Sequence, residues 1–155
     1  MLQHLTDPVA ALREMRRVRA PDGVVAVRDS DYEAMTWYPG SGGLMRWLDL
    51  YRDTARADGG EPDAGRRLVS WARQAGFTDV TSSVSGWCYS DRADIDWWSE
   101  SWSQRVKVSA FAEHAIEHGL ATSADLDELS AAWLEWGARD DAWFAILHGE
   151  VLCRG

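Results

Sequence analysis

A run of polar and charged side chains follows the first strongly apolar segment of the chain. Residues 24–27 are apolar without interruption, which is typical of a strand buried on both faces in a parallel sheet. Open α/β sheets bind their ligands at the carboxyl ends of such strands. The position therefore predicts a ligand site made of the next residues, which are Arg28, Asp29, Ser30, Asp31 and Tyr32.

The chemistry of this run suits a reaction at a hydroxyl group. Asp29 and Asp31 are predicted to be catalytic, because a carboxylate can orient an acceptor hydroxyl or take its proton. Arg28, Ser30 and Tyr32 are predicted to contact the substrate. Asp and Ser are also common at the start of loops, so a purely structural role for the run stays open.

Ten tryptophans in 155 residues are the main compositional anomaly of the chain. Residues 33–43 contain Pro39 and three glycines, which predicts a loop. Trp37 within this loop is the best candidate for a pocket wall that contacts the substrate. Most other tryptophans are expected in the core, as the helical spacing of Trp98 and Trp102 indicates.

The elements that must position these residues alternate between helices and strands. Asp7-Pro8 is typical of a helix start, with Asp7 as the cap and Pro8 in the first turn. After the strand at 24–27 we expect helices at 44–57, from 62 or 63 to 75, 91–105, 109–118 and 123–138, and strands within 77–89 and 143–152. This alternation predicts an α/β fold with about three strands.

Composition and charge restrict the partners. The chain has 25 acidic and 16 basic side chains and a net charge of −9, so it should repel phosphate backbones and bind no nucleic acid. Its basic residues cluster on the first expected helix, where a solvated face is favoured over an anion site. No apolar run approaches the length of a membrane span, so we expect no membrane partner.

The cysteines and histidines indicate a reduced protein without a metal. Cys88 and Cys153 are isolated, which favours a reduced, cytoplasmic protein over a disulfide scaffold. His114 and His118 have helical spacing but no nearby third ligand in the sequence, so no metal site is expected.

The beginning of the chain resembles a known family. Residues 2–8 (LQHLTDP), 12–18 (LREMRRV) and 21–27 (PDGVVAV) are similar to the second half of class I S-adenosylmethionine-dependent methyltransferases of the ubiquinone/menaquinone-biosynthesis type. In that family a fourth strand ends in a segment like the first of these, and a helix, a Pro-Gly turn and a fifth strand follow. Residues 65–80 and 143–154 resemble the entry into its sixth strand and its closing seventh strand.

The resemblance implies a partial Rossmann-like methyltransferase fold that lacks the N-terminal cofactor-binding strands. It implies one partial domain over residues 1–155, with a helical insertion at about 91–138 and the last two strands antiparallel. It also implies S-adenosylmethionine as cofactor, a small-molecule methyl acceptor, and His4 as a cofactor-binding residue. The family's E/DxGxGxG loop is absent, because Gly42-Gly43 and Gly59-Gly60 do not have that spacing. We therefore expect an incomplete enzyme that binds the cofactor poorly by itself, through a natural truncation or a misplaced start.

Two alternatives to an enzyme stay open. The first is a non-catalytic remnant that oligomerises: without a fourth strand beside it, the strand at 24–27 is an apolar edge, which predicts a homodimer through these residues. The second is a small aromatic-lined binding protein, which the tryptophans suggest. Titration with S-adenosylmethionine and light scattering separate these alternatives.

Overall fold

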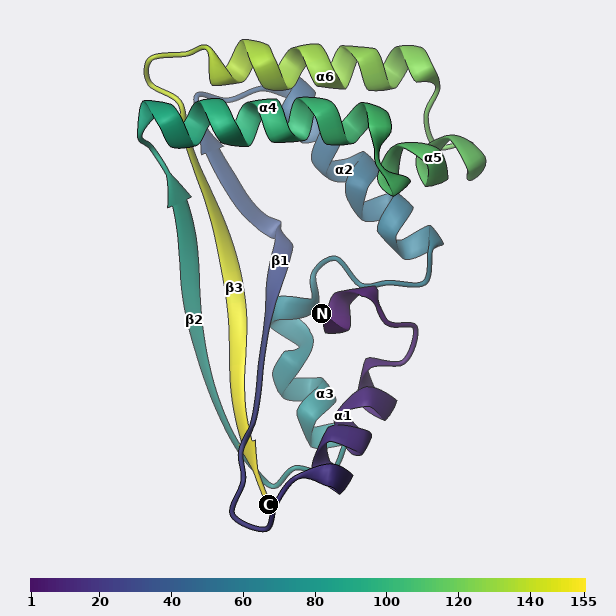
Figure 1. Ribbon diagram of the computed structural model, residues 1–155, viewed down its shortest axis with the longest axis vertical. Helices are drawn as coiled ribbons and strands as arrows, with labels where there is room; N and C mark the ends of the chain where they lie inside the picture. Colours follow the sequence, from purple (N-terminus) through teal and green to yellow (C-terminus); the bar gives the residue numbers. More distant parts are fainter. The chain divides into compact units, whose positions relative to one another are not determined.

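The computed structural model describes residues 1–155 and consists of helices and strands in alternation, which confirms the α/β prediction (Figure 1). The strands are β1 (Val25–Tyr38), β2 (Asp79–Tyr89) and β3 (Trp143–Arg154). The α-helices are α1 (Pro8–Val18), α2 (Gly42–Ala57), α3 (Leu68–Gln74), α4 (Arg92–Val108), α5 (Ala110–Glu117) and α6 (Ser123–Gly137). Two short 3-10 helices, η1 (Leu2–His4) and η2 (Ala64–Arg67), complete the set.

The three strands form one sheet in the order β1-β3-β2, so the last strand of the chain lies in the middle. β1 and β2 run in one direction and β3 runs in the other (Figure 1). Each neighbouring pair is therefore antiparallel, which confirms the prediction for the last two strands. This open sheet with its helices is consistent with a partial Rossmann-like fold.

β1 differs from the sequence prediction in two respects. It continues to Tyr38, so the loop predicted over residues 33–43 is wrong for its first half, and Arg28–Tyr32 lie within the strand rather than at its end. The expected burial of both faces is also wrong, because Val25 and Val27 are buried whereas Ala26 is exposed. The sequence pattern does not predict this part of the strand, because the polar residues Asp29 and Asp31 occupy positions on its buried face.

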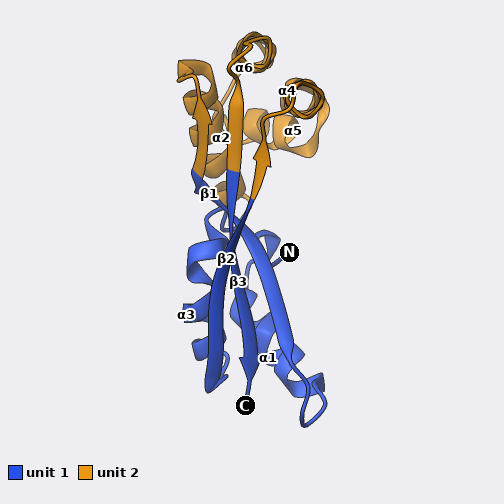
Figure 2. Ribbon diagram, turned by 90° about the vertical axis from the view of Figure 1, so that its left-hand side faces the viewer, with its two compact units in different colours: residues 1–34, 59–86, 146–155 blue, residues 35–58, 87–145 orange.

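The chain forms two compact units, coloured separately in Figure 2. Unit 1 comprises residues 1–34, 59–86 and 146–155, and unit 2 comprises residues 35–58 and 87–145. The helices α4, α5 and α6, predicted as an insertion at about 91–138, all belong to unit 2. The single domain over residues 1–155 stays a prediction.

The core of unit 1 is aliphatic and lies between α1, α3 and the strands. Asp7 caps α1 by accepting a hydrogen bond from the Ala10 amide at 2.8 Å, as predicted. Gly76 follows α3 in the left-handed region, with φ of 95°. The buried residues of this core are Leu2, Leu12, Val25, Val27, Leu68, Ala72, Ala75, Phe77, Val151 and Cys153.

The core of unit 2 is aromatic. Trp98 and Trp102 of α4 are buried, which confirms their predicted core position. Rings from α2, α4, α6 and β3 pack in edge-to-face, stacked or tilted pairs at centroid distances of 4.4–5.9 Å. The residues concerned are Trp47, Trp98, Trp102, Trp133, Trp136 and Phe144. A capping box between Thr122 and Asp125 starts α6.

Candidate functional site

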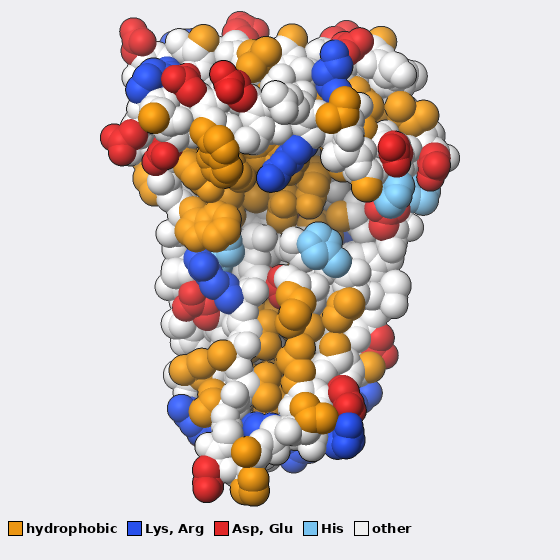
Figure 3. Space-filling model, viewed as in Figure 1, with side chains coloured by type: hydrophobic (Ala, Val, Ile, Leu, Met, Phe, Trp, Pro, Cys, Tyr) orange, Lys and Arg blue, Asp and Glu red, His pale blue; other side chains and the backbone are white.

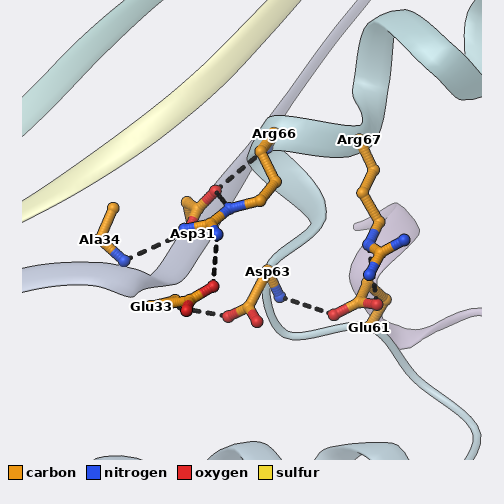
Figure 4. A network of polar contacts seen from close by, with 7 residues as sticks. All are labelled: Asp31, Glu33, Ala34, Glu61, Asp63, Arg66 and Arg67. Carbon is orange, nitrogen blue, oxygen red and sulfur yellow. Dashed lines mark hydrogen bonds and ion pairs between the residues drawn. The ribbon is translucent and has the colours of Figure 1, made fainter.

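Asp31 lies at the centre of a polar network in unit 1 (Figure 4). Its side chain is about 2% exposed and accepts two hydrogen bonds from the Arg66 guanidinium, from Nε at 2.7 Å and from Nη2 at 2.7 Å. The backbone amides of Arg66 and Ala34 donate to the same carboxylate at 3.1 and 3.2 Å. The hydrogen bonds that Arg66 donates to Asp31 raise the pKa of Arg66, so its guanidinium stays charged across the physiological range.

Further acidic and basic side chains extend the network along the turn before η2. Arg66 also bridges to Glu33, and the Glu33 amide donates to Asp63 at 2.9 Å. Glu61 accepts the Asp63 amide at 3.1 Å and pairs with Arg67 at 2.8 Å. Because the contacts of Asp31 and Glu33 with Arg66 and Asp63 join β1 to the segment 61–67, the network fixes that segment against the strand.

Gly65 makes this close approach possible. A Cβ at Gly65 would lie 3.0 Å from the Asp29 carbonyl oxygen, 3.1 Å from the Asp31 Cβ and 2.9 Å from the Gly149 amide nitrogen. The backbone of η2 is thus seated directly on β1 and β3, where no larger residue fits.

Asp29 is the second buried carboxylate, and η1 covers it. It accepts the Leu2 amide at 2.9 Å and pairs with the amino group of Met1. Asp29 and Asp31 are two residues apart on one face of β1, but they contact different groups. The two carboxylates predicted to be catalytic therefore bind different groups, Asp29 the η1 segment and Asp31 the Arg66 side chain. Their catalytic role stays a prediction.

Ser30 and His4 are connected through Gln3. The Ser30 hydroxyl donates to Gln3 Oε1 at 3.1 Å, and Gln3 Nε2 lies 3.0 Å from His4 Nε2. His4 itself is exposed. The residue predicted to bind cofactor and one residue predicted to bind substrate thus share one hydrogen-bonded chain in unit 1.

Arg28 points to the opposite face of β1. It forms an ion pair with Glu150 of β3 at 3.3 Å, and Ser83 and Ser85 of β2 donate to the same Glu150 carboxylate at 2.9 and 2.6 Å. These hydrogen bonds lower the pKa of Glu150. Since alternate residues of a strand face opposite sides, Arg28 is separated from Asp29 and Asp31 by the sheet.

His148 on β3 is a titratable residue that sequence reasoning missed as a site candidate. It is 6% exposed, and burial together with the nearby Arg28 charge lowers its pKa, against the opposing effects of Glu150 and Asp29. Its imidazole is therefore neutral at pH 7 and can accept a proton. A lone histidine in an apolar strand gives no sequence signal for this, because only strand pairing brings the charges of Arg28, Glu150 and Asp29 within its reach.

The two predicted aromatic contacts belong to different units. Tyr32 is buried in unit 1, and its amide donates to the Pro62 carbonyl at 3.3 Å. Trp37 is half-buried in unit 2 and stacks on Phe144 with a centroid distance of 5.8 Å and an interplanar angle of 10°. Its predicted role as a pocket wall stays a prediction.

One glycine of the segment 40–43 serves helix packing. At Gly43 a Cβ would clash with the Ala132 side chain, so this glycine brings α2 and α6 into contact. At Gly40 and Gly42 a Cβ would meet nothing within 4 Å, and both glycines line a surface pocket of about 300 Å³. The spacing of these glycines does not fit the E/DxGxGxG loop for S-adenosylmethionine. No group of three or more His, Cys, Asp or Glu side chains is arranged to hold a metal ion.

Comparison with known proteins finds two relatives named as methyltransferases but no matching family model. No protein-family model matches the chain. An uncharacterized methyltransferase of Schizosaccharomyces pombe is 31% identical over 98% of this chain and 54% of its own length. A "probable methyltransferase", LtbC of Aspergillus luteorubrus, is 30% identical over 94% of this chain and 53% of its own length.

The chain thus spans about half the length of these relatives. The similarity, which extends over nearly the whole chain, supports the methyltransferase part of the resemblance. No helix of the structure combines the length and apolar composition that a membrane span needs.

Proposed function

We propose that this chain supplies the acceptor side of an S-adenosylmethionine-dependent methyltransferase that acts on a small molecule. The observation that carries the proposal is the 30–31% identity to two methyltransferases over nearly the whole chain. The sheet order β1-β3-β2 with a reversed central strand agrees with it. The ubiquinone/menaquinone type, the cytoplasmic location and the cofactor itself belong to the proposal.

Among the candidate residues, we propose different roles for the two carboxylates. Asp31 accepts four hydrogen bonds within the chain, so a proton from an acceptor would have to compete with Arg66. Asp31 is therefore best suited to holding β1 and η2 in place. Asp29 accepts one backbone hydrogen bond and pairs with the Met1 amino group, and we assign to it the orientation of a hydroxyl and to His148 the acceptance of its proton. Ser30 and Tyr32 of the same unit are the proposed substrate contacts. Arg28 lies on the opposite face of the sheet and Trp37 belongs to unit 2, so their contacts with a substrate stay predictions.

Measurement of cofactor binding tests whether the cofactor site lies in the part of the relatives outside the matched region. The chain alone should show no calorimetric binding of S-adenosylmethionine at micromolar concentrations, because it has no fitting glycine loop. A fusion to the segment of the S. pombe protein outside the matched region should bind it and methylate members of a panel of small hydroxylated acceptors. Micromolar binding by the isolated chain, or an inactive but folded fusion that binds no cofactor, would contradict the proposal.

A second candidate role is self-association, in which two copies form a homodimer through the edge of β1. β1 lies at the edge of the sheet, and Val24 next to it is 43% exposed, so the backbone groups of residues 24–27 are accessible for pairing with a second copy. We propose Val24→Lys as the test, because a lysine at a strand edge discourages pairing. Light scattering should change from a dimer to a monomer, whereas a monomeric wild-type chain would exclude this candidate.

A further inference from the structure

Four arginines line one surface hollow of unit 1. Arg13, Arg16 and Arg17 of α1 and Arg19 just after it surround a space of about 530 Å³, which Ala75 and Gly155 complete. None of the residues that line it is acidic. Figure 3 shows Lys and Arg side chains around the end of unit 1 at which α1 ends.

The charges in this hollow are largely uncompensated by acidic side chains. Several arginines elsewhere pair with carboxylates, as Arg28 does with Glu150 and Arg46 with Glu128. Of the four in the hollow only Arg17 has such a partner, Glu14, at 2.7 and 2.6 Å. The other three guanidinium groups make no ion pair although the chain holds 25 acidic side chains.

Neighbouring groups hold the guanidinium groups in place but leave most of their donors available. Arg16 donates to the Gly155 carbonyl at 3.0 Å and stacks over the Phe77 ring at 5.9 Å. Arg13 makes only a long bond of 3.4 Å to the Gln74 carbonyl. Arg19 uses one nitrogen for the carbonyls at 21 and 23, and its buried Nε has no acceptor. Because a guanidinium has five N–H donors, most donors of these three groups form no hydrogen bond within the chain.

We propose that this hollow binds a small molecule with two or more phosphoryl groups. Planar guanidinium forks match the oxygen geometry of phosphoryl groups and bind them through paired, charge-assisted hydrogen bonds. Three uncompensated positive charges at close range match the charge of a diphosphate, and the volume lies within the range of small-molecule sites. The site is independent of methyl transfer, since its residues lie on α1 and not on the Asp29–Tyr32 segment.

Calorimetric titration with inorganic diphosphate at low ionic strength tests the proposal. The double variant Arg13→Gln/Arg16→Gln should bind diphosphate about tenfold or more weakly, since two charge-assisted contacts are removed. Arg46→Gln removes the same charge from unit 2 and should leave the affinity unchanged. Arg19 is retained because it donates to the turn that precedes β1.

A charge-preserving variant keeps the test independent of folding. Arg13→Lys/Arg16→Lys retains both charges but loses the forks, so diphosphate binding should weaken by about threefold or more while circular dichroism stays unchanged. Equal affinity in the double glutamine variant, or equal binding of sulfate at the same ionic strength, would overturn the proposal. Binding to vesicles of anionic phospholipid without binding of free diphosphate would also overturn it, because the site would then recognise a membrane surface.

Discussion

At the scale of single residues, the two carboxylates predicted as catalytic differ in their hydrogen-bond partners. Asp31 accepts hydrogen bonds from Arg66 and Ala34, whereas Asp29 contacts η1, and its charge raises the pKa of His148 against the effect of burial. Residue type alone predicts the same chemistry for both. Burial and hydrogen-bond partners make one a structural anchor and leave the other as a candidate for chemistry.

The anchoring role of Asp31 predicts a large effect on stability. Asp31→Asn should lower the free energy of unfolding by about 2–3 kcal/mol, because it removes a buried acceptor of charged donors. Urea unfolding followed by circular dichroism measures this loss. The matched control is Glu33→Gln, which breaks an exposed ion pair of the same arginine and should cost less than about 1 kcal/mol. Equal effects of the two substitutions would contradict the anchoring role.

His148 predicts acid sensitivity. Burial and Arg28 lower the pKa of His148 in the folded chain from the ordinary 6.5. Below pH 6.5 the unfolded chain therefore binds more protons than the folded chain, and the free energy of unfolding decreases as the pH decreases. Urea midpoints measured between neutral pH and pH 5 should decrease in the wild type and decrease less steeply in His148→Gln. A variant with the same slope as the wild type would show that other groups cause the acid sensitivity.

At the scale of elements, one carboxylate joins two helices of unit 2. Asp58, just after α2, lies 2.7 Å from His114 Nδ1 and 2.8 Å from His118 Nε2, and both histidines belong to the α5 segment. The hydrogen bond to Asp58 raises the pKa of His114. Although partial burial opposes it, the hydrogen bonds from His118 and His114 lower the pKa of Asp58.

The pairing of α2 with α5 should therefore be strongest at mildly acidic pH. The raised histidine pKa adds stability that is complete below pH 6.5 and is lost as the pH rises through the folded value. The lowered aspartate pKa adds stability that is present above 3.8 and is lost as the pH falls through the folded value. In the wild type the urea midpoint should decrease as the pH rises above 6.5, and in Asp58→Asn this decrease should be absent. The same pH profile in both proteins would refute the pairing.

The contact between α2 and α6 depends on one glycine. Gly43→Ala should destabilise the chain by about 1–3 kcal/mol, because the new methyl group collides with Ala132. Gly42→Ala is the matched control one position earlier in the same helix, where the methyl group meets nothing within 4 Å. It should be neutral or raise the melting temperature slightly, since alanine favours helix. A lower melting temperature in the control than in Gly43→Ala would contradict the close helix contact.

At the scale of the whole molecule, charge is distributed unevenly. Unit 2 holds 15 acidic and 7 basic side chains, whereas unit 1 holds 10 and 9. Self-repulsion in unit 2 should therefore weaken the folded state at low ionic strength. Added sodium chloride should raise the melting temperature by a few degrees, corresponding to about 1 kcal/mol, because it screens exposed charges. A melting temperature that falls with salt would mean that attractive ion pairs dominate.

The sequence by itself determined the order of elements, the helix caps at Asp7 and Thr122, the core position of Trp98 and Trp102 and the methyltransferase resemblance. These depend on local periodicity, capping chemistry and residue size, which operate over a few neighbouring residues. The tertiary structure alone decided that β1 runs through the polar segment to Tyr38, because Arg66 and the Leu2 amide, distant in sequence, satisfy its buried carboxylates. It likewise brought the charge of Asp29 within reach of His148 and placed Ala75 and Gly155 beside the arginines of α1, since strand pairing and helix packing join residues that no local pattern connects.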